Sequence, residues 1–401
     1  MSDIKRYRKQ RLKRRRQQDE NVDFEERLRM HKKRMLILIL SIIAFLLVVA
    51  ISVKLYIDNR VFDGYEVESV VNSGETYGCS FYEFSKCFLR CSNDGITYMN
   101  GKDVMWNQPF EMKTPLIDVC GSTVAIAESG GVNIYIYNSS GALGEVPTKY
   151  PIQSLDVSEQ GVVAAITLGE GVNYIEVYDK EGNQLAWGQA SLSGESGYPI
   201  DLSISNDGQK MIASYLYVDG SDIQNKIVFY NFSEVGKNEV DRIVGVFVHY
   251  GTTILPKVEF ISNNVAVAFG DDIMTVYSMK QKPSIVYEDE VSNVKSVFYS
   301  KDYIGLVMET DDAEKPYRVR VIDGKGKKLL DKKTDIEYTG VKLDGKNVIL
   351  YNDIEMQVIS FNGVVKFDGE YEEEITDILI TGKQYVYYVV TRTGVKKVKL
   401  K

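Results

Sequence analysis

The chain has 401 residues, 44% of them hydrophobic and 26% charged, which suits a globular protein and excludes a chain disordered over most of its length. This length is enough for two medium-sized domains or for one large all-β domain. The formal net charge of −8 divides unevenly: residues 1–34 carry 14 Lys/Arg against 6 Asp/Glu, residues 35–60 add +1, and residues 61–401 therefore carry −17. A basic head on an acidic body predicts that the two parts meet different surroundings.

Residues 1–34 are predicted to be a basic cytoplasmic head, helical in part because Glu25 and Arg29 can pair one turn apart. The stretch "KRYRKQRLKRRR" at 5–16 would attract nucleic acid, but the head has only two aromatic residues for base stacking. A role in membrane topology, with contact to anionic lipid, is therefore favoured over nucleic-acid binding. The head is too short for a kinase or transcription-factor domain, so signalling would need a recruited partner.

Met35–Val53 is an apolar run of 19 residues without a charge. A helix of this length spans about 28 Å, close to the hydrocarbon thickness of a bilayer, so we expect a transmembrane helix over residues 35–57. The cations that precede it and set its topology are Arg14, Arg15, Arg16, Lys32, Lys33 and Arg34. Only Lys54 and Arg60 follow closely, which predicts a single-pass protein of the cell membrane with its C-terminal domain outside the cytoplasm. The alternative, a cleaved signal peptide, would have a shorter apolar region and an A-x-A-like cleavage site.

Cysteines occur early in the acidic body. They are Cys79, Cys87, Cys91 and Cys120. Cys79 and Cys91 can face each other across a hairpin that turns near Ser85 and can form a disulfide, or all four can be small buried thiols. Zinc is not expected, because the chain has no C-x-x-C pair and only two histidines, His31 and His249.

A short dyad recurs through the body: an apolar or aromatic residue followed by Asp, Asn or Ser at the end of a β-rich run. The dyads are Met99-Asn100, Tyr137-Asn138, Tyr178-Asp179, Tyr230-Asn231, Tyr277-Ser278, Ile322-Asp323 and Phe361-Asn362. Successive dyads lie 38, 41, 52, 47, 45 and 39 residues apart, and a further step of about this size reaches the terminal strand "GVKKVKL". The body therefore contains seven repeats and a truncated eighth.

The order of elements around each dyad is also repeated. An apolar segment such as "LIDVCG" precedes a strongly apolar strand such as "TVAIAE", and the dyad strand follows before a Gly-containing turn and a last strand. Four antiparallel strands in about 43 residues are typical of a propeller blade. We therefore predict an all-β fold, an eight-bladed β-propeller over residues 77–401, with seven blades as the alternative. Tandem β-sandwiches would need a longer period.

The last repeat has too little chain for four strands. Its missing strand is predicted to be "YEVESVV" at 65–71, within a linker of residues 58–76. Glu66 and Glu68 would share one face of this strand, and Lys397 and Lys399 would share one face of the terminal strand. Antiparallel pairing would set acid against base and close the ring.

The repeats resemble those of known propellers. "VYDKEGNQLAW" at 177–187 is similar to the Asp-x-x-Gly-x-x-x-x-Trp repeat of pyrroloquinoline-quinone-like propellers, and "SISNDGQKMIA" at 203–213 is similar to the Ser-Pro-Asp-Gly turn of WD40-like propellers. The layout also resembles uncharacterised propeller proteins of Gram-positive anaerobes that have one membrane span and a basic head. Because tryptophan occurs only at positions 106 and 187, the regular Trp docking of quinone enzymes is absent. The resemblance implies the fold and not quinone chemistry.

Catalytic groups are scarce in the body. His249 is its only histidine, so a Ser-His-Asp triad is not expected, and no G-x-S-x-G, H-E-x-x-H or Walker-type loop occurs. Paired carboxylates occur between strands, for example at 271–272 and 372–374, where solvated acidic loops are the default. Calcium binding and glycoside chemistry are weaker alternatives for these loops. We therefore expect no enzyme activity, no catalytic residues and no cofactor.

The sequence as a whole predicts a membrane-tethered extracytoplasmic propeller that acts as a binding or scaffold module in the cell envelope. Its partner would be an envelope protein or a glycan. Three long insertions mark candidate partner surfaces: 190–199, 217–225 and 233–241. The alternatives are a transmembrane sensor, which couples an extracellular ligand to a cytoplasmic partner, and an enzyme that processes glycan or peptide.

Overall fold

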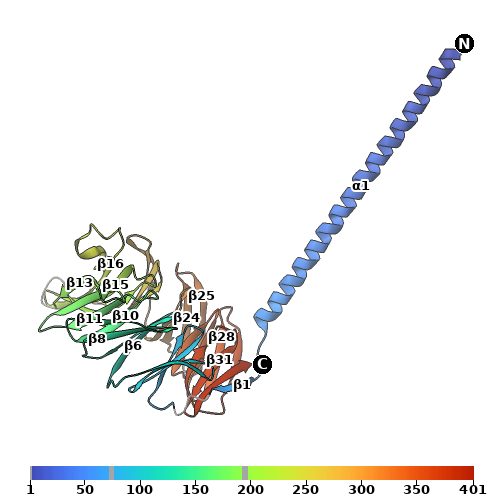
Figure 1. The fold of residues 1–401 in the computed structure, drawn as a ribbon. Helices are drawn as coiled ribbons and strands as arrows, with labels where there is room; N and C mark the ends of the chain where they lie inside the picture. The colour runs from blue at the N-terminus through green and yellow to red at the C-terminus, as the bar shows by residue number, and fades with distance from the viewer. Residues whose placement is uncertain (1, 72–75, 192–196) are drawn as a thin grey trace. The chain divides into compact units, whose positions relative to one another are not determined.

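The computed structural model describes residues 2–71, 76–191 and 197–401, except for the side chains of residues 2, 3 and 16–28. The chain divides into two compact units, residues 1–60 and residues 61–401 (Figure 1).

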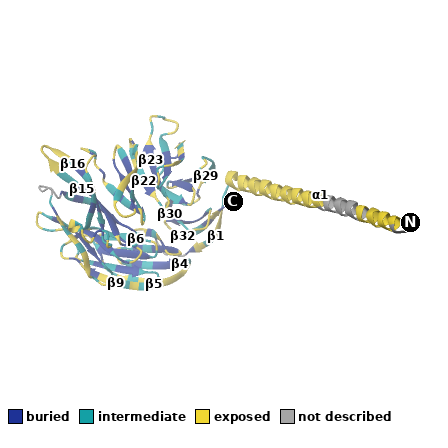
Figure 2. Cartoon of the chain, turned by 90° about the horizontal axis from the view of Figure 1, so that it is seen from above, coloured by how far each residue is buried: buried dark blue, intermediate teal, exposed yellow. Residues whose placement is uncertain are grey.

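The first unit is one helix, α1 (Ser2–Asn59). Its segment Arg29–Asn59 is long and apolar enough to cross a membrane. The apolar residues of this segment are exposed, and the segment is coloured yellow in Figure 2. A run of about 20 exposed apolar residues suits lipid better than water, and a signal sequence has the same composition.

The second unit is an eight-bladed β-propeller, as predicted, built from eight four-stranded antiparallel sheets. Blades are numbered along the chain, and the first strand of each blade is the innermost. Blades 1 and 2 comprise β2 (Ser80–Phe84), β3 (Cys87–Ser92), β4 (Gly95–Asn100), β5 (Asp103–Pro109), β6 (Pro115–Cys120), β7 (Thr123–Glu128), β8 (Asn133–Asn138) and β9 (Gly141–Pro147). Blades 3 and 4 comprise β10 (Ile152–Val157), β11 (Val163–Leu168), β12 (Asn173–Tyr178), β13 (Gln184–Ala190), β14 (Tyr198–Ile204), β15 (Lys210–Asp219), β16 (Asp222–Asn231) and β17 (Ile243–Phe247), with the short helix η1 (Val240–Arg242) before β17.

The other blades repeat this arrangement. Blades 5 and 6 comprise β18 (Lys257–Ser262), β19 (Val265–Phe269), β20 (Ile273–Met279), β21 (Pro283–Glu290), β22 (Val294–Tyr299), β23 (Tyr303–Glu309), β24 (Tyr317–Asp323) and β25 (Lys328–Thr334). Blades 7 and 8 comprise β26 (Gly340–Asp344), β27 (Asn347–Tyr351), β28 (Glu355–Ser360), β29 (Val365–Glu370), β30 (Ile375–Ile380), β31 (Val386–Thr391), β32 (Gly394–Leu400) and β1 (Tyr65–Val71).

Strand β1 joins the two ends of the propeller chain in blade 8, where it is the outermost strand beside β32. The pairing runs from Tyr65 opposite Leu400 to Val71 opposite Val395, with Glu66 opposite Lys399. A bulge at Glu68 shifts the register, and its Oε2 lies 2.8 Å from Nζ of Lys397. The ring therefore has no unpaired end, which protects an all-β protein from edge-to-edge aggregation.

The core lies between neighbouring blades, because the blade before and the blade after each sheet cover its two faces. One cluster packs Ile166 and Val177 of blade 3 against Ala213 and Val228 of blade 4, and similar clusters recur around the ring. The sheets approach closely at Gly144 of β9, where a Cβ atom would lie 2.0 Å from a main-chain oxygen of blade 3. Dense packing of this kind leaves space only where strands diverge or end.

Strand direction alternates within each blade, so the connections fall at two ends of the ring. The loop face carries the blade-to-blade connections and the hairpins between second and third strands. The turn face carries the other two turns of each blade, including the hairpin at Asp179, whose Oδ1 accepts the amides of Glu181 and Asn183. The recurring Asp and Asn residues are thus turn formers, and Gly182 completes this turn with φ +82°.

Candidate functional site

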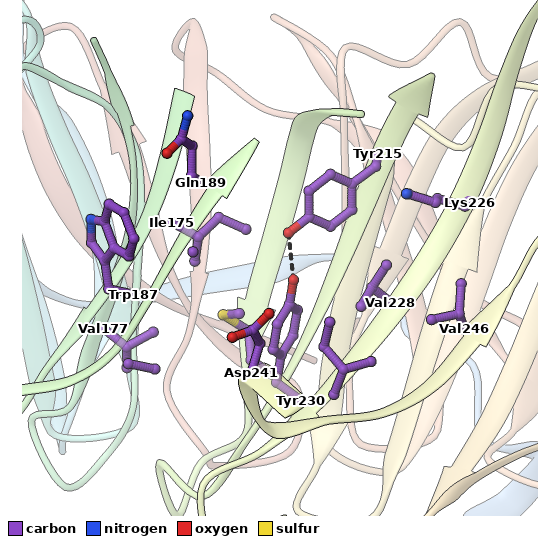
Figure 3. Close-up of a pocket in the computed structure, with 14 residues that line it drawn as sticks. Ile175, Val177, Trp187, Gln189, Tyr215, Lys226, Val228, Tyr230, Asp241 and Val246 are labelled. Atoms are coloured by element: carbon purple, nitrogen blue, oxygen red, sulfur yellow. Dashed lines mark hydrogen bonds between the residues drawn. The ribbon is translucent and has the colours of Figure 1, made fainter. Parts of the chain in front are cut away.

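A pocket of about 350 Å³ lies between blades 3 and 4 (Figure 3). Strands β12 and β13 form one wall, and strands β15, β16 and β17 form the other. Its apolar lining consists of Ile175, Val177, Met211, Val228, Ile243 and Val246. This volume lies within the range of small-ligand and side-chain pockets, about 300–1,000 Å³.

The polar groups of the pocket come from blade 4. The hydroxyl oxygens of Tyr215 and Tyr230 are 2.5 Å apart, and Figure 3 shows them facing each other with Asp241 next to Tyr230. Burial raises the pKa of Tyr230 to about 12, with a further contribution from the charge of Asp241. Both phenols are therefore neutral at physiological pH.

Each of these two hydroxyls carries one proton, and the hydrogen bond between them uses only one of the two protons. The other proton has no acceptor within the described residues, so it is available to a ligand. The pocket thus combines apolar walls with a hydroxyl donor and a carboxylate.

Asp241 is held by an unusual backbone. It lies in η1, where Asp241 and Arg242 have φ values of +51° and +59°. Arg242 Nη1 donates to the carbonyl oxygen of Phe232 at 3.1 Å, which fixes the end of the connection between β16 and β17. Positive φ is costly for residues other than glycine, although Asp and Asn tolerate it best, and such geometry is enriched at functional sites.

The mouth of the pocket is amphipathic. Val246 is 49% exposed and Trp187 is 45% exposed, and the Trp187 ring stacks on Tyr174 with centroids 5.4 Å apart. The ammonium of Lys226 lies 5.7 Å from the ring centroid of Tyr215 and 5.4 Å from that of Tyr217. Cation–π contacts of this length hold the lysine stem against the wall.

A second charged region lies on the innermost strands. We call Asp118, Asp156, Asp201 and Glu259, which come from blades 2 to 5, the inner acid cluster. Three of these carboxylates accept a main-chain amide from the next blade; the bonds are Val157 N to Asp118 Oδ2 (2.8 Å), Ile204 N to Asp156 Oδ2 (3.0 Å) and Val258 N to Asp201 Oδ2 (2.7 Å). The innermost strand of a blade has no fifth strand beside it, so these side chains satisfy amides that would otherwise lack a partner.

The electrostatics of this cluster are unfavourable for full ionisation. Burial raises the pKa of Asp156 well above its usual value, and the charges of Asp118 and Glu259 raise it further. Burial also raises the pKa values of Asp201 and Glu259, although Lys257 opposes this with its Nζ 3.4 Å and 3.2 Å from their carboxylate oxygens. Lys257 therefore lies between two of the four acids, Asp201 and Glu259.

This arrangement predicts how stability depends on pH. A carboxyl group whose pKa is raised by folding stays protonated at pH values where the same group in the unfolded chain is ionised. Its contribution to the free energy of unfolding therefore falls as pH rises from about 4 through the folded pKa. We expect the protein to gain stability when pH is lowered from about 7.5 to about 5.5, and Asp156→Asn to raise Tm by about 2 °C at the higher pH. Asn keeps an acceptor for Ile204 N and carries no charge.

Thermal unfolding at both pH values is the measurement. Asp302→Asn, at an exposed turn, is the control, and it should change neither Tm nor the pH dependence of Tm. A wild-type Tm that rises with pH over this range would contradict the prediction.

Sequence reasoning named other residues for special roles. The cations Arg14, Arg15, Lys32, Lys33 and Arg34 are exposed on α1, and the side chain of Arg16 lies outside the described residues. Their role in topology remains a prediction.

The disulfide between Cys79 and Cys91 is not formed. Ser80, not Cys79, lies opposite Cys91 in the ladder, and the Cys79 amide instead closes a turn with Thr76. All four cysteines are free thiols. Burial raises the pKa of Cys91, and burial raises the pKa of Cys120 to about 12, so both are protonated at neutral pH.

His249 contacts a carboxylate of β21. His249 Nε2 lies 2.8 Å from Glu288 Oε1, on the exposed loop face. Within residues 2–71, 76–191 and 197–401, no three His, Cys, Asp or Glu side chains are grouped to hold a metal ion. Calcium binding in the loops remains an untested alternative.

The three long insertions do not share one surface. The hairpin at 217–225 and the blade connection at 190–199 lie on the loop face, and residues 192–196 of that connection are outside the described part of the chain. The insertion at 233–241 joins a third strand to a fourth strand and lies on the turn face. It contributes Asp241 to the pocket. Val177, Trp187, Met211 and Tyr230 of the walls belong to the repeat motifs, which predicted the fold and not a pocket.

Comparisons with known proteins agree with the fold. The sequence model of a "family of unknown function (DUF5711)" matches residues 58–400, which include β1. No curated protein matches the sequence. Among solved structures, Sqt1 from Chaetomium thermophilum has a TM-score of 0.51 at 9% identity, covering 84% of this chain and 100% of that chain.

Two further solved structures are similar to this chain. Sqt1 from the same organism bound to the N-terminus of the ribosomal protein L10 has a TM-score of 0.50 at 8% identity, with 84% of this chain and 100% of that chain covered. Hydrazine synthase from Kuenenia stuttgartiensis has a TM-score of 0.42 at 14% identity, with coverages of 76% and 99%. At these identities the similarity shows the fold alone.

Proposed function

The chain belongs to the DUF5711 family of unknown function, and we propose that its propeller is a non-catalytic binding module that captures a protein partner in the pocket between blades 3 and 4. The observation that carries this proposal is the combination of apolar walls with a hydroxyl donor and the carboxylate of Asp241. Surfaces of this kind bind side chains and main-chain groups of partner proteins.

Membrane tethering is part of the same proposal. The apolar segment Arg29–Asn59 would anchor the protein, and the cations before it would keep the N-terminus in the cytoplasm. The propeller, with a net charge of −17, would then face the cell envelope. Solved propellers of this fold include one bound to the N-terminus of another protein, which supports the use of a propeller as a peptide-binding platform without assigning that partner here.

Photo-crosslinking in intact cells tests the proposal. A photoreactive amino acid at position 246, on the rim of the pocket, is expected to trap a partner that faces the outside of the membrane. The matched control is position 70 on β1, which has the same 49% exposure and lies outside the pocket. Equal crosslinking from both positions, or none from position 246, would contradict a role for this pocket. Degradation of the trapped complex by external protease would report the orientation of the propeller.

A transmembrane sensor is the second candidate. The observation in its favour is that α1 continues without a break from the basic head through the apolar segment. A pull-down with residues 1–34 distinguishes the two functions, because only the sensor needs a cytoplasmic partner.

A further inference from the structure

We infer that the pocket between blades 3 and 4 recognises an extended peptide segment in which a basic residue stands next to an apolar one. This inference rests on the proposed function and specifies the chemistry of the partner. Three features of the pocket carry it: the charge at one end, the unused hydroxyl proton and the shape of the apolar walls.

The charge at the turn-face end is negative. Asp241 lines the pocket, and its carboxylate forms no hydrogen bond or ion pair within the described residues. The other charged lining residue, Lys226, lies against the rings of Tyr215 and Tyr217, near the opposite end of the pocket. A ligand that enters beside Val246 can therefore place a cation at Asp241 while its apolar part remains between the walls (Figure 3).

The hydroxyl pair adds a requirement for an acceptor. Because the bond between Tyr215 and Tyr230 leaves one proton over, a ligand gains by bringing a carbonyl oxygen to that position. A peptide presents such a carbonyl at every residue, and successive side chains of an extended peptide point to opposite sides. An extended segment can thus satisfy the hydroxyl and offer an apolar side chain to the wall and a basic one to Asp241.

The overall charge of the propeller favours the same class of partner. A net charge of −17 over residues 61–401 attracts cationic segments and repels acidic ones before contact is made. A neutral glycan could donate hydroxyl groups to Asp241, but it would gain no charge attraction from this field. The peptide is therefore favoured over the glycan.

Fluorescence anisotropy with the full-length protein in detergent micelles tests this inference. The probe is the labelled, end-blocked peptide Gly-Ser-Leu-Lys-Val-Ser-Gly, and its counterpart carries Glu in place of Lys. We expect the Lys peptide to bind at least about tenfold more tightly than the Glu peptide, and Asp241→Asn to weaken the Lys peptide by about tenfold. Asn tolerates the positive φ at this position, so the backbone should be retained.

Two further variants separate recognition from general charge effects and from misfolding. Asp222→Asn removes the same charge from the tip of the β15–β16 hairpin, outside the pocket, and should leave peptide binding unchanged. Gly188→Leu should abolish binding without unfolding, because a Cβ at this pocket-lining position meets no atom within 4 Å.

Equal affinity for the two peptides, or equal effects of Asp241→Asn and Asp222→Asn, would overturn the inference, as would binding of a neutral cell-wall oligosaccharide that Gly188→Leu abolishes. If position 246 still crosslinks a partner in cells while the Lys peptide fails to bind, the inference falls and the proposed function stands. If crosslinking fails as well, both fall.

Discussion

Val71→Asp is expected to lower the free energy of unfolding by about 3 kcal/mol or more, because it places a charge in a dry core without a partner. Val71 is only 2% exposed and packs in a cluster with Phe88, Tyr388 and Val395. Its strand is the one that closes the ring, so loss of its docking should open the seam between the two ends of the chain. Urea denaturation followed by tryptophan fluorescence measures the effect, since Trp106 packs against the same cluster.

The neighbouring residue provides a matched control. Val70 is 49% exposed and stands opposite Lys396 in the ladder. Val70→Asp adds the same charge to the same strand, and we expect it to change the free energy of unfolding by less than about 0.5 kcal/mol. If the two variants were equally stable, β1 would not dock through the face that the structure gives it.

Gly144→Ala is expected to destabilise the propeller by about 2–3 kcal/mol, because the added methyl group has no room between blades 2 and 3. The new Cβ would lie 2.0 Å from the carbonyl oxygen of Lys180, which is main chain and cannot turn away. The two blades would have to separate, and the effect should appear as a lower denaturation midpoint with an unchanged m-value.

Gly64→Ala is the control for this substitution. A Cβ at Gly64 meets no atom within 4 Å, and the residue does not need a left-handed conformation. Its midpoint should stay within the error of the wild-type value. A midpoint for Gly144→Ala as high as that of the control would show that the blades are less closely packed at this point.

The number of blades and the closure of the ring could be predicted from local features of the sequence. Each blade repeats the same order of apolar segment, apolar strand, dyad and turn. Turn residues such as Asp179 and Gly182 favour the turn conformation that they adopt in the structure. The closing strand could be found because the last repeat was one strand short. Such signals depend on neighbours along the chain, so they survive in a single sequence.

The pocket could not be predicted in the same way, because its walls meet only after blades 3 and 4 pack. Ile175 and Val228 look like ordinary core residues, and Asp241 looks like part of an exposed insertion. The inner acid cluster did leave a signal that was overlooked: Asp118 and Asp156 interrupt otherwise apolar first strands at equivalent places. A buried acid that recurs within apolar strands indicates a repeated structural bond more often than a solvated loop.

The position of β1 has a mechanical consequence if α1 is anchored as proposed. The chain leaves the helix at Asn59 and is already part of the outermost strand of blade 8 at Tyr65. A force on the anchor is then transmitted to the β1–β32 ladder, which runs from Tyr65–Leu400 to Val71–Val395. Such a force strains the strand pairing that closes the ring. Release of an intact ring by proteolysis would require a cut between Asn59 and Tyr65, because a cut within β1 would free a body with an open seam.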